Sequence, residues 1–294
     1  MKSRKRFSGE IFYNIFEYLF LGLFALVTIY PFYNVLVVSL TTESALIHDP
    51  MMLYPKEFTL MSYQTILRDP NFIRAFCNSI LVAVLGTAYS MILTICCSYV
   101  LTKTQVKGIK FFFGMIIVTM FFNGGLIPTY LNIQSLHIMN SIWAVILPAG
   151  INTFYMILMV NSIRDLPASL EESARIDGAG DGTILFRIIV PLCKPTIMAI
   201  LLFTIVDRWN EWYSVMLYLN DPKKWPLTYV LRNMLIKITS STDPATQRLL
   251  AQKEVFSSGL QRAAIILTIL PIMLIYPFLQ KYFTKGIMVG AIKG

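Results

Sequence analysis

Long apolar runs alternate with short polar segments along the chain. Six runs hold about 20 residues or more, the length that an α-helix needs to cross the hydrocarbon core of a bilayer. They lie near residues 15–40, 76–101, 110–131, 140–161, 195–219 and 262–283. Backbone polar groups inside hydrocarbon must pair within the protein, so runs of this length predict helices. The pattern predicts an all-α polytopic membrane protein, with six transmembrane helices in one domain over residues 15–285.

Glycine and proline interrupt this pattern at two places. The segment Asn123-Gly-Gly-Leu-Ile-Pro128 lies in the third run, and Pro191 and Pro195 flank the start of the fifth. Proline lacks the N–H that a helix interior needs, and paired glycines weaken a helix locally. We therefore expect a helix break at each place.

Composition and charge are typical of a protein solvated by lipid. Apolar residues make up 56% of the 294 residues and charged residues only 14%. This is more apolar surface than a water-soluble domain can bury. The net charge of +9 comes from Lys and Arg in loops between apolar runs, without a nucleic-acid-binding motif. We therefore expect a membrane protein with no nucleic-acid partner.

The same basic residues orient the chain. Fourteen lie in the N-terminal segment, the 102–110 loop, the 162–194 loop and the C-terminal tail, and ten lie on the opposite side, seven of them in one long loop. Basic residues in short loops favour the cytoplasm, and long loops count weakly. We expect a cytoplasmic N-terminus over 1–14 and a cytoplasmic tail over 286–294.

No residue pattern indicates catalysis or metal binding. His48 and His137 lie in expected external loops without a triad or ligand spacing, and no Gly is followed directly by Lys, as a Walker A loop requires. The cysteines form no CxxC pair; they are Cys77, Cys96, Cys97 and Cys193. We expect a protein that is not an enzyme, with no metal and no cofactor.

A loop over 166–191, between the fourth and fifth runs, predicts a short helix. Pro167 suits a helix start, Ser169 is placed to cap it, and Glu171 and Glu172 fall in the first turn, where the helix dipole favours negative charge. A helix that projects between two spans suits docking on a partner protein.

Glycines predict where this helix ends. Gly178 and Gly180 lie in the run Asp177-Gly-Ala-Gly-Asp-Gly182, and glycine adopts the left-handed backbone angles of a sharp reversal. We expect the chain to turn there into a second amphipathic piece.

The spacing in this loop resembles a known family. Glu172-Ser173-Ala174, three residues, Gly178, nine residues and Ile188-x-Val190-Pro191 match the EAA loop, E-A-A-x3-G-x9-I-x-L-P, of permeases of ATP-binding-cassette (ABC) importers. The departures are Ser173, where the family prefers Ala, and Val190, where it prefers Leu; both are small.

The resemblance implies a type I ABC importer permease fold, in which Glu171–Gly182 forms a coupling helix seated in a cleft of the ATPase subunit. The alternative is an ordinary amphipathic loop helix. The residues that the resemblance assigns to ATPase coupling are Glu171, Glu172, Ser173, Ala174, Asp177, Gly178, Ala179 and Pro191.

The C-terminal run Gly286–Gly294 is similar to the tail of the smaller permease of maltose-type importers, which also ends in Lys-Gly. That resemblance implies contact with the ATPase by Gly286, Gly290, Lys293 and Gly294; the alternative is a frayed terminus. Both resemblances point to the carbohydrate-uptake branch, and within it to permeases assigned to lipoproteins and complex glycans.

A polar stretch in the fifth run indicates a solute pathway. Asp207-Arg-Trp-Asn-Glu-Trp-Tyr213 places ionisable groups at a depth where they usually face water or each other, and Arg208 and Glu211 have the spacing of a helical ion pair. An interfacial aromatic belt with a structural ion pair is the alternative. The candidate lining residues are Asn123, Asn152, Tyr155, Asp207, Arg208, Trp209, Asn210 and Glu211.

We therefore expect the permease subunit of a binding-protein-dependent importer of a sugar or oligosaccharide in a bacterial cell membrane. The expected partners are a second homologous permease, two ATPase subunits that bind ATP and Mg, and an extracellular solute-binding protein. A non-sugar solute such as a peptide or amino acid is one alternative. A secondary transporter is another, although no internal repeat supports it.

Overall fold

The computed structural model describes residues 3–49, 52–122, 124–239 and 258–277. Its contacts divide the chain into a first unit, residues 1–69 and 233–268, and a second unit, residues 70–232 and 269–294. The described residues form helices and connecting loops, with an isolated β-bridge between Thr41 and Phe58. This confirms the expected all-α class.

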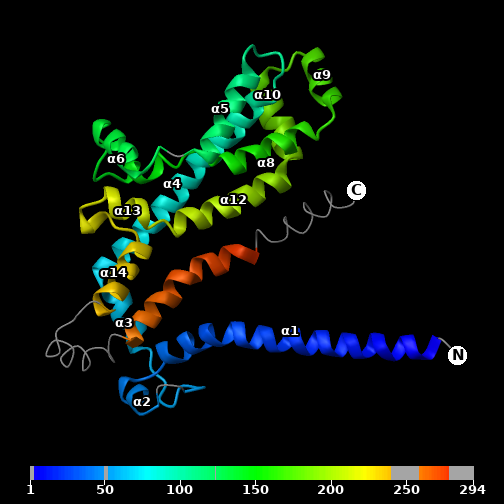
Figure 1. The fold of residues 1–294 in the computed structure, drawn as a ribbon. Coiled ribbons are helices and arrows are strands. Elements are labelled where there is room, and N and C mark those ends of the chain that lie inside the picture. Colours follow the sequence, from blue (N-terminus) through cyan, green and yellow to red (C-terminus); the bar gives the residue numbers. More distant parts are fainter. Residues whose placement is uncertain (1–2, 50–51, 123, 240–257, 278–294) are drawn as a thin grey trace. The chain divides into compact units, whose positions relative to one another are not determined.

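The helices vary widely in length (Figure 1). Those that open the chain are α1 (Ser3–Ser39), α2 (Glu43–His48) and α3 (Met61–Arg68). They are followed by α4 (Pro70–Leu101), α5 (Ile109–Phe121), α6 (Leu126–Ser135), α7 (Ile142–Ile146), α8 (Thr153–Arg164), α9 (Ala168–Ile176), α10 (Asp181–Ile184), the π-helix η1 (Leu185–Ile189), α11 (Val190–Leu192), α12 (Lys194–Trp209), α13 (Tyr213–Tyr218), the 3₁₀ turn η2 (Pro222–Lys224) and α14 (Leu227–Thr239). A further helix covers Ser258–Pro277.

Within the first unit, α1 carries a large exposed apolar surface, which is unfavourable in water. Large apolar side chains stay exposed along it, among them Phe24 and Leu26, which keep 63% and 69% of their surface. Its stretch Tyr13–Ser39 has the length and hydropathy of a membrane span. Lipid is the solvent that suits this surface.

Within the second unit, α4 packs along α12 and α8 (Figure 1). The packed face of α4 carries small residues at helical spacing, which let neighbouring backbones approach closely. They are Ser79, Ala83, Gly86, Ser90, Thr94 and Ser98. Some also bond to neighbouring helices: Ser98 Oγ donates to the Met156 carbonyl of α8 at 3.1 Å, and Ser79 Oγ accepts from the Leu227 N–H of α14 at 2.8 Å.

Both expected helix breaks are present. Helix α5 ends at Phe121 and α6 begins at Leu126, with Gly125 in the left-handed region at φ +89°. The axes of Asp181–Leu192 and Lys194–Trp209 differ by 83°, which places the second bend between Pro191 and Pro195. The missing proline N–H groups explain why the helix does not run through.

The expectation of one continuous helix over 140–161 is wrong. The chain forms the five-residue α7, which is capped by Leu147 at helical angles, and resumes in α8 at Thr153. Pro148 has no N–H to donate to the preceding turn, so the helix does not continue through it. Gly150 lies close to α4, because a Cβ built on it would come within 2.6 Å of the Tyr89 ring. Proline and glycine two residues apart were a signal in the sequence for this break.

The expected fifth helix over 195–219 is also divided. Helix α12 ends at Trp209, and α13 begins at Tyr213. In the described part of the chain, three single helices have the length and hydropathy of a span, and two bent pairs bring that number to five. These are Tyr13–Ser39, Pro70–Leu101, Ser258–Pro277, the pair Ile109–Phe121 with Leu126–Ser135, and the pair Asp181–Leu192 with Lys194–Trp209.

Candidate functional site

Helix α9 begins at Ala168, two residues earlier than a Ser169 cap would place it. Pro167 occupies the N-cap position, with extended backbone angles, and makes no side-chain cap. Ser169 lies inside the first turn, so the expected Ser169 cap is wrong. The proline decides the boundary because its fixed φ and its missing N–H suit the first positions of a helix.

The end of α9 is a Schellman turn at the first of the two expected glycines. The last helical residue is Ile176, and Gly178 follows with φ +82°. The Ala179 N–H donates to the Ala174 carbonyl at 2.9 Å, and the Gly178 N–H donates to the Arg175 carbonyl at 3.0 Å. This pair of bonds defines the motif, which needs a residue that tolerates positive φ. A side chain at position 178 would strain the reversal.

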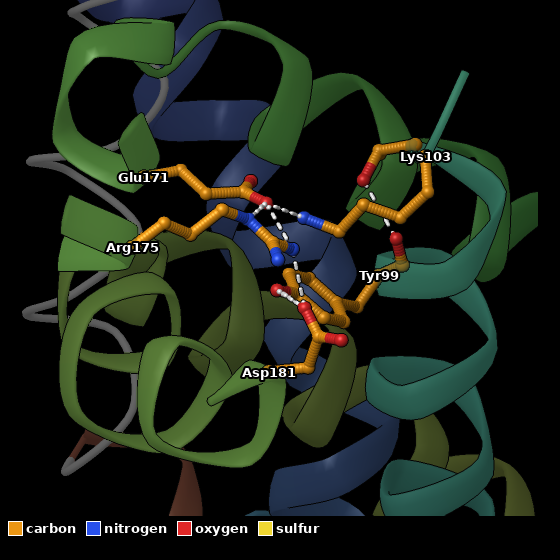
Figure 2. Close-up of polar contacts among 6 residues, drawn as sticks. Tyr99, Lys103, Glu171, Arg175 and Asp181 are labelled. Carbon is orange, nitrogen blue, oxygen red and sulfur yellow. Dashed lines mark hydrogen bonds and ion pairs between the residues drawn. The ribbon is translucent and has the colours of Figure 1, made fainter. Parts of the chain in front are cut away.

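A network of charged side chains ties α9 to the end of α4 (Figure 2). The Lys103 ammonium, two residues beyond α4, forms an ion pair and hydrogen bond with Glu171 Oε1. The same oxygen accepts from Arg175 Nη2 at 3.0 Å, and that nitrogen also donates to Asp181 Oδ1 at 2.5 Å. Three segments therefore meet in one ionic cluster.

Tyr99 completes the cluster from the last turn of α4. Its hydroxyl donates to Asp181 Oδ1 at 3.2 Å, and the Lys103 ammonium lies 3.8 Å from the centre of its ring (Figure 2). We define the coupling network as Tyr99, Lys103, Glu171, Arg175 and Asp181. The sequence analysis singled out only Glu171 among them. The four-residue spacing of Tyr99 and Lys103 indicates a shared face, but nothing local predicts their partners, Asp181 on α10 and Glu171 on α9.

The network sets the charge state of Glu171. Burial alone would raise the pKa of the Glu171 carboxyl, but hydrogen bonds and charge from Lys103 and Arg175 outweigh it, and the pKa lies below its usual value. Glu171 therefore stays ionised and keeps both partners at neutral pH.

The outer face of α9 is exposed among the described residues. Glu172, Ser173 and Asp177 are exposed, while Ala174 turns inward and is buried. Ile176, the last residue of α9, keeps 86% of its surface exposed. A large apolar residue held out beside charged ones suits insertion into a cleft of another protein. The sequence analysis missed Ile176. Ala179 is half-buried, and Pro191 is exposed on α11.

A second polar feature is a cavity of about 130 Å³ among α4, α8, α12 and the break in the fourth run. We call it the polar cavity. Its lining residues are Ser90, Thr94, Ala149, Asn152, Tyr155, Thr204, Asp207, Arg208 and Glu211. Five of these were named as candidate lining residues. Ser90, Thr94 and Thr204 were missed, because small hydroxyl residues in an apolar helix read equally well as packing.

Two candidate lining residues lie outside the cavity, and a third is not among the described residues. Trp209 is buried and meets the Phe76 ring edge-on, with centroids 6.0 Å apart. Asn210 is exposed at the end of α12. Asn123 lies outside the described residues, as do Gly286, Gly290, Lys293 and Gly294 of the tail.

The expected ion pair between Arg208 and Glu211 is absent from the described part of the chain. Arg208 Nη2 donates instead to Ser90 Oγ at 2.8 Å and to the Ala149 carbonyl. Glu211 Oε1 accepts from the Ser214 N–H at 2.9 Å. Helix α12 ends between them at Trp209, so the i, i+3 geometry that brings two helical side chains together is lost.

A family model described as the inner membrane component of binding-protein-dependent transport systems matches residues 79–289. The chain belongs to this family. The match covers the coupling network, α9 and the polar cavity. The chain is therefore a membrane-embedded, non-catalytic transport subunit, the permease of an ABC importer.

Individual relatives extend over almost the whole permease. It is 39% identical over 289 residues to Protein LplC of Bacillus subtilis, covering 98% of this chain and 96% of that one. It is 36% identical over 282 residues to the polygalacturonan/rhamnogalacturonan transport system permease protein YtcP of the same organism, covering 96% and 98%.

The fold of the permease matches a solved structure. A chain of a bacterial ABC transporter involved in the import of the acidic polysaccharide alginate superposes with a TM-score of 0.86 at 30% identity, covering 94% of this chain and 98% of that chain. The expected type I importer fold is confirmed.

Proposed function

We propose that the permease forms one half of the translocation pathway of an ATP-driven importer for oligosaccharides. Relatives named for polygalacturonan and rhamnogalacturonan transport and for alginate import support this class of solute. A second permease subunit forms the other half. An extracellular binding protein delivers the solute, and two separate ATPase subunits bind ATP and Mg.

The observation that carries the proposal is the attachment of α9 to α4. The outer face of α9 is free for an ATPase, while its inner face is held by Lys103 at the end of the 32-residue α4. Movement of the ATPase against α9 therefore moves the end of α4, and α4 packs on α12 and α8 around the polar cavity. ATP binding would in this way change access to the cavity from the two sides of the membrane.

In the proposed orientation of the permease, α9, both termini and the tail lie on the cytoplasmic side. The basic residues of the short loops support this arrangement, and so does α9 itself, because the ATPase requires cytoplasmic ATP. The tail residues Gly286, Gly290, Lys293 and Gly294 are proposed as a second ATPase contact.

The test uses Gly178. In the complete complex, reconstituted with partner permease, ATPase and binding protein, Gly178→Val should lower ATP-dependent uptake at least tenfold while ATP hydrolysis continues. A β-branched residue does not fit φ +82° without strain, so α9 would be displaced from the ATPase.

The matched control is Gly180→Ala. Gly180 has φ −76° and no atom within 4 Å of an added Cβ, so this variant should transport normally. Normal uptake by Gly178→Val would contradict the coupling role of α9. Uptake by the wild-type permease in vesicles that lack the ATPase would contradict the proposal of an ATP-driven importer and would favour a secondary transporter.

A further inference from the structure

The loop between α8 and α12 contains a second helical piece beyond α9. It runs from Asp181 to Leu192 through α10, η1 and α11, and we call it the bridging helix because it connects α9 to α12. Its axis makes an angle of 83° with the axis of α12. Membrane-spanning helices tilt by about 20° from the bilayer normal on average, so with α12 in the membrane the bridging helix lies within roughly 30° of the membrane plane.

The bridging helix also lies at the depth where the fifth apolar run enters the membrane. It ends at Leu192, and α12 starts at Lys194. Consecutive Cα atoms are 3.8 Å apart, so Leu192 lies within about 8 Å of the first residue of α12. Because Lys194 is charged and the apolar run follows it, the boundary of the membrane falls at this junction.

One face of the bridging helix is packed into the protein. Ile184, Leu185 and Ile189 keep at most 5% of their surface. The cluster that buries them is formed by α4, α8, α9 and the start of α12, through Met91, Tyr99, Met159, Ile163, Ala174, Cys193, Ile197 and Ile200. This packing fixes which side chains of the bridging helix turn outward.

The outward face combines an aromatic ring with a positive charge. Thr183, Phe186 and Arg187 are exposed at helical spacing, and Phe186 keeps 63% of its surface. Leu192 adds exposed apolar surface next to α12. Within the part of the chain that the structure describes, Arg187 forms no ion pair, and the stretch 182–192 contains no acidic residue.

The headgroup region of a bilayer suits this face better than water does. An exposed phenylalanine ring is unfavourable in water, whereas at the membrane boundary it packs against acyl chains. The planar guanidinium of arginine binds phosphate oxygens through two N–H groups at once. A helix that lies in the membrane plane with apolar and basic side chains turned outward is typical of a helix bound to the membrane surface.

The charge of the neighbouring helix supports this assignment. The outer face of α9 carries Glu172 and Asp177, which are both exposed. Anionic lipids of the cytoplasmic leaflet repel such a face and attract Arg187. The reversal at Gly178 therefore separates an acidic helix, which suits the cytoplasm, from a basic helix, which suits the membrane surface.

We propose that the bridging helix binds the cytoplasmic surface of the bilayer. Phe186 inserts among the acyl chains, and Arg187 binds the phosphate groups of anionic phospholipids. This inference rests on the proposed function, which places the loop on the cytoplasmic side. The lipid contact holds the bridging helix at the membrane surface while the ATPase moves α9. The competing occupants of the outward face are the ATPase and the second permease subunit.

Photo-crosslinking identifies what covers the outward face. Phe186 is replaced by p-benzoylphenylalanine in the complete complex, reconstituted in nanodiscs of phosphatidylcholine and phosphatidylglycerol in equal parts and with the same acyl chains. After irradiation, mass spectrometry should find phospholipid attached to the permease. The same label in place of Thr183, on the same face, should give the same adduct and serves as the test where a label at position 186 prevents folding.

The matched control places this label at Ile176, the exposed apolar residue of α9. It should give adducts with the ATPase and none with lipid. Adducts with the ATPase or the second permease at position 186, or no lipid adduct there, would overturn the lipid contact alone. A label at position 176 that never reaches the ATPase would contradict the docking of α9, so the two proposals fail by different results.

Arg187 should make the contact selective for anionic lipid. The attraction of one basic residue to an anionic surface corresponds to roughly a fivefold enrichment, so phosphatidylglycerol should exceed phosphatidylcholine at least threefold among the adducts at position 186. Arg187→Gln should bring this ratio close to one without changing the melting temperature, because Arg187 is exposed.

The control for charge is Lys107→Gln, which removes an exposed positive charge from the 102–110 loop and should leave the ratio unchanged. Equal adducts of the two lipids in the wild-type complex would overturn the binding of anionic phospholipid. The same conclusion would follow if Arg187→Gln kept the threefold excess.

Discussion

The coupling network and the polar cavity use charge in opposite ways. In the coupling network, each cation meets a carboxylate at the rim of the protein, where Lys103 and Glu171 keep 15% and 27% of their side chains exposed. In the cavity, Arg208 is buried and is held by a hydroxyl and a backbone carbonyl. Exposed ion pairs contribute little to stability, whereas a buried charge costs free energy unless its donors are satisfied. The network therefore positions α9, and the hydrogen bonds of Arg208 hold helices together.

The largest effect that this comparison predicts concerns Arg208. Arg208→Met removes the donors to Ser90 Oγ and to the Ala149 carbonyl. The carbonyl then keeps only a long hydrogen bond of 3.5 Å from the Ser90 hydroxyl, and this loss should cost about 2 kcal/mol of stability. Thermal melting of the complex in nanodiscs measures the loss. Arg187→Ala, an exposed arginine on η1, should leave the melting temperature unchanged. Equal melting temperatures for Arg208→Met and wild type would remove the structural role of Arg208.

The next effect concerns the pairing of Lys103 with Glu171. Lys103→Glu and Glu171→Lys should each lower uptake about fivefold through like-charge contacts, with a change in stability below about 1 kcal/mol because the pair is partly exposed. The double exchange re-forms this pair in reverse but leaves a lysine facing Arg175, so it should restore part of the uptake. ATP hydrolysis measured beside uptake distinguishes uncoupling from unfolding. A double exchange that transports no better than either single variant would show that the pair does not link α9 to α4.

The smallest effect is a dependence on pH. Because the pKa of Glu171 is lowered in the folded protein, its contribution is fully present above the usual carboxyl pKa and is lost as pH falls through the lower, folded value. The protection of the α9 amides, which is the intrinsic exchange rate at each pH divided by the measured rate, should therefore be constant near neutrality and should fall in that acid range. Glu171→Gln should exchange faster at neutral pH and lose this acid step. If Glu171→Gln showed the same change at acid pH as the wild type, that change would come from another carboxyl group.

Some of the site could be read from local sequence. Gly178 or Gly180 was expected to end α9, and Gly178 does, because a positive-φ reversal depends on one residue and its immediate neighbours. Pro191 and Pro195 were expected to bend the chain, since a missing N–H acts within one helical turn. The Ser169 cap failed at the same local level, because two adjacent start signals competed and Pro167 prevailed.

The sequence by itself determined the solvent of this protein and the positions of its turns, because the length of apolar runs and the backbone preferences of Gly and Pro act over a few residues. Only the tertiary structure decided the partners of its charges. Arg208 lies three residues from Glu211, yet it bonds to Ser90 and Ala149, which are 118 and 59 residues away in sequence. Lys103 likewise meets Glu171 across 68 residues. Such partners depend on how the helices pack against one another and on where each helix ends. The spacing of residues along one helix predicts neither.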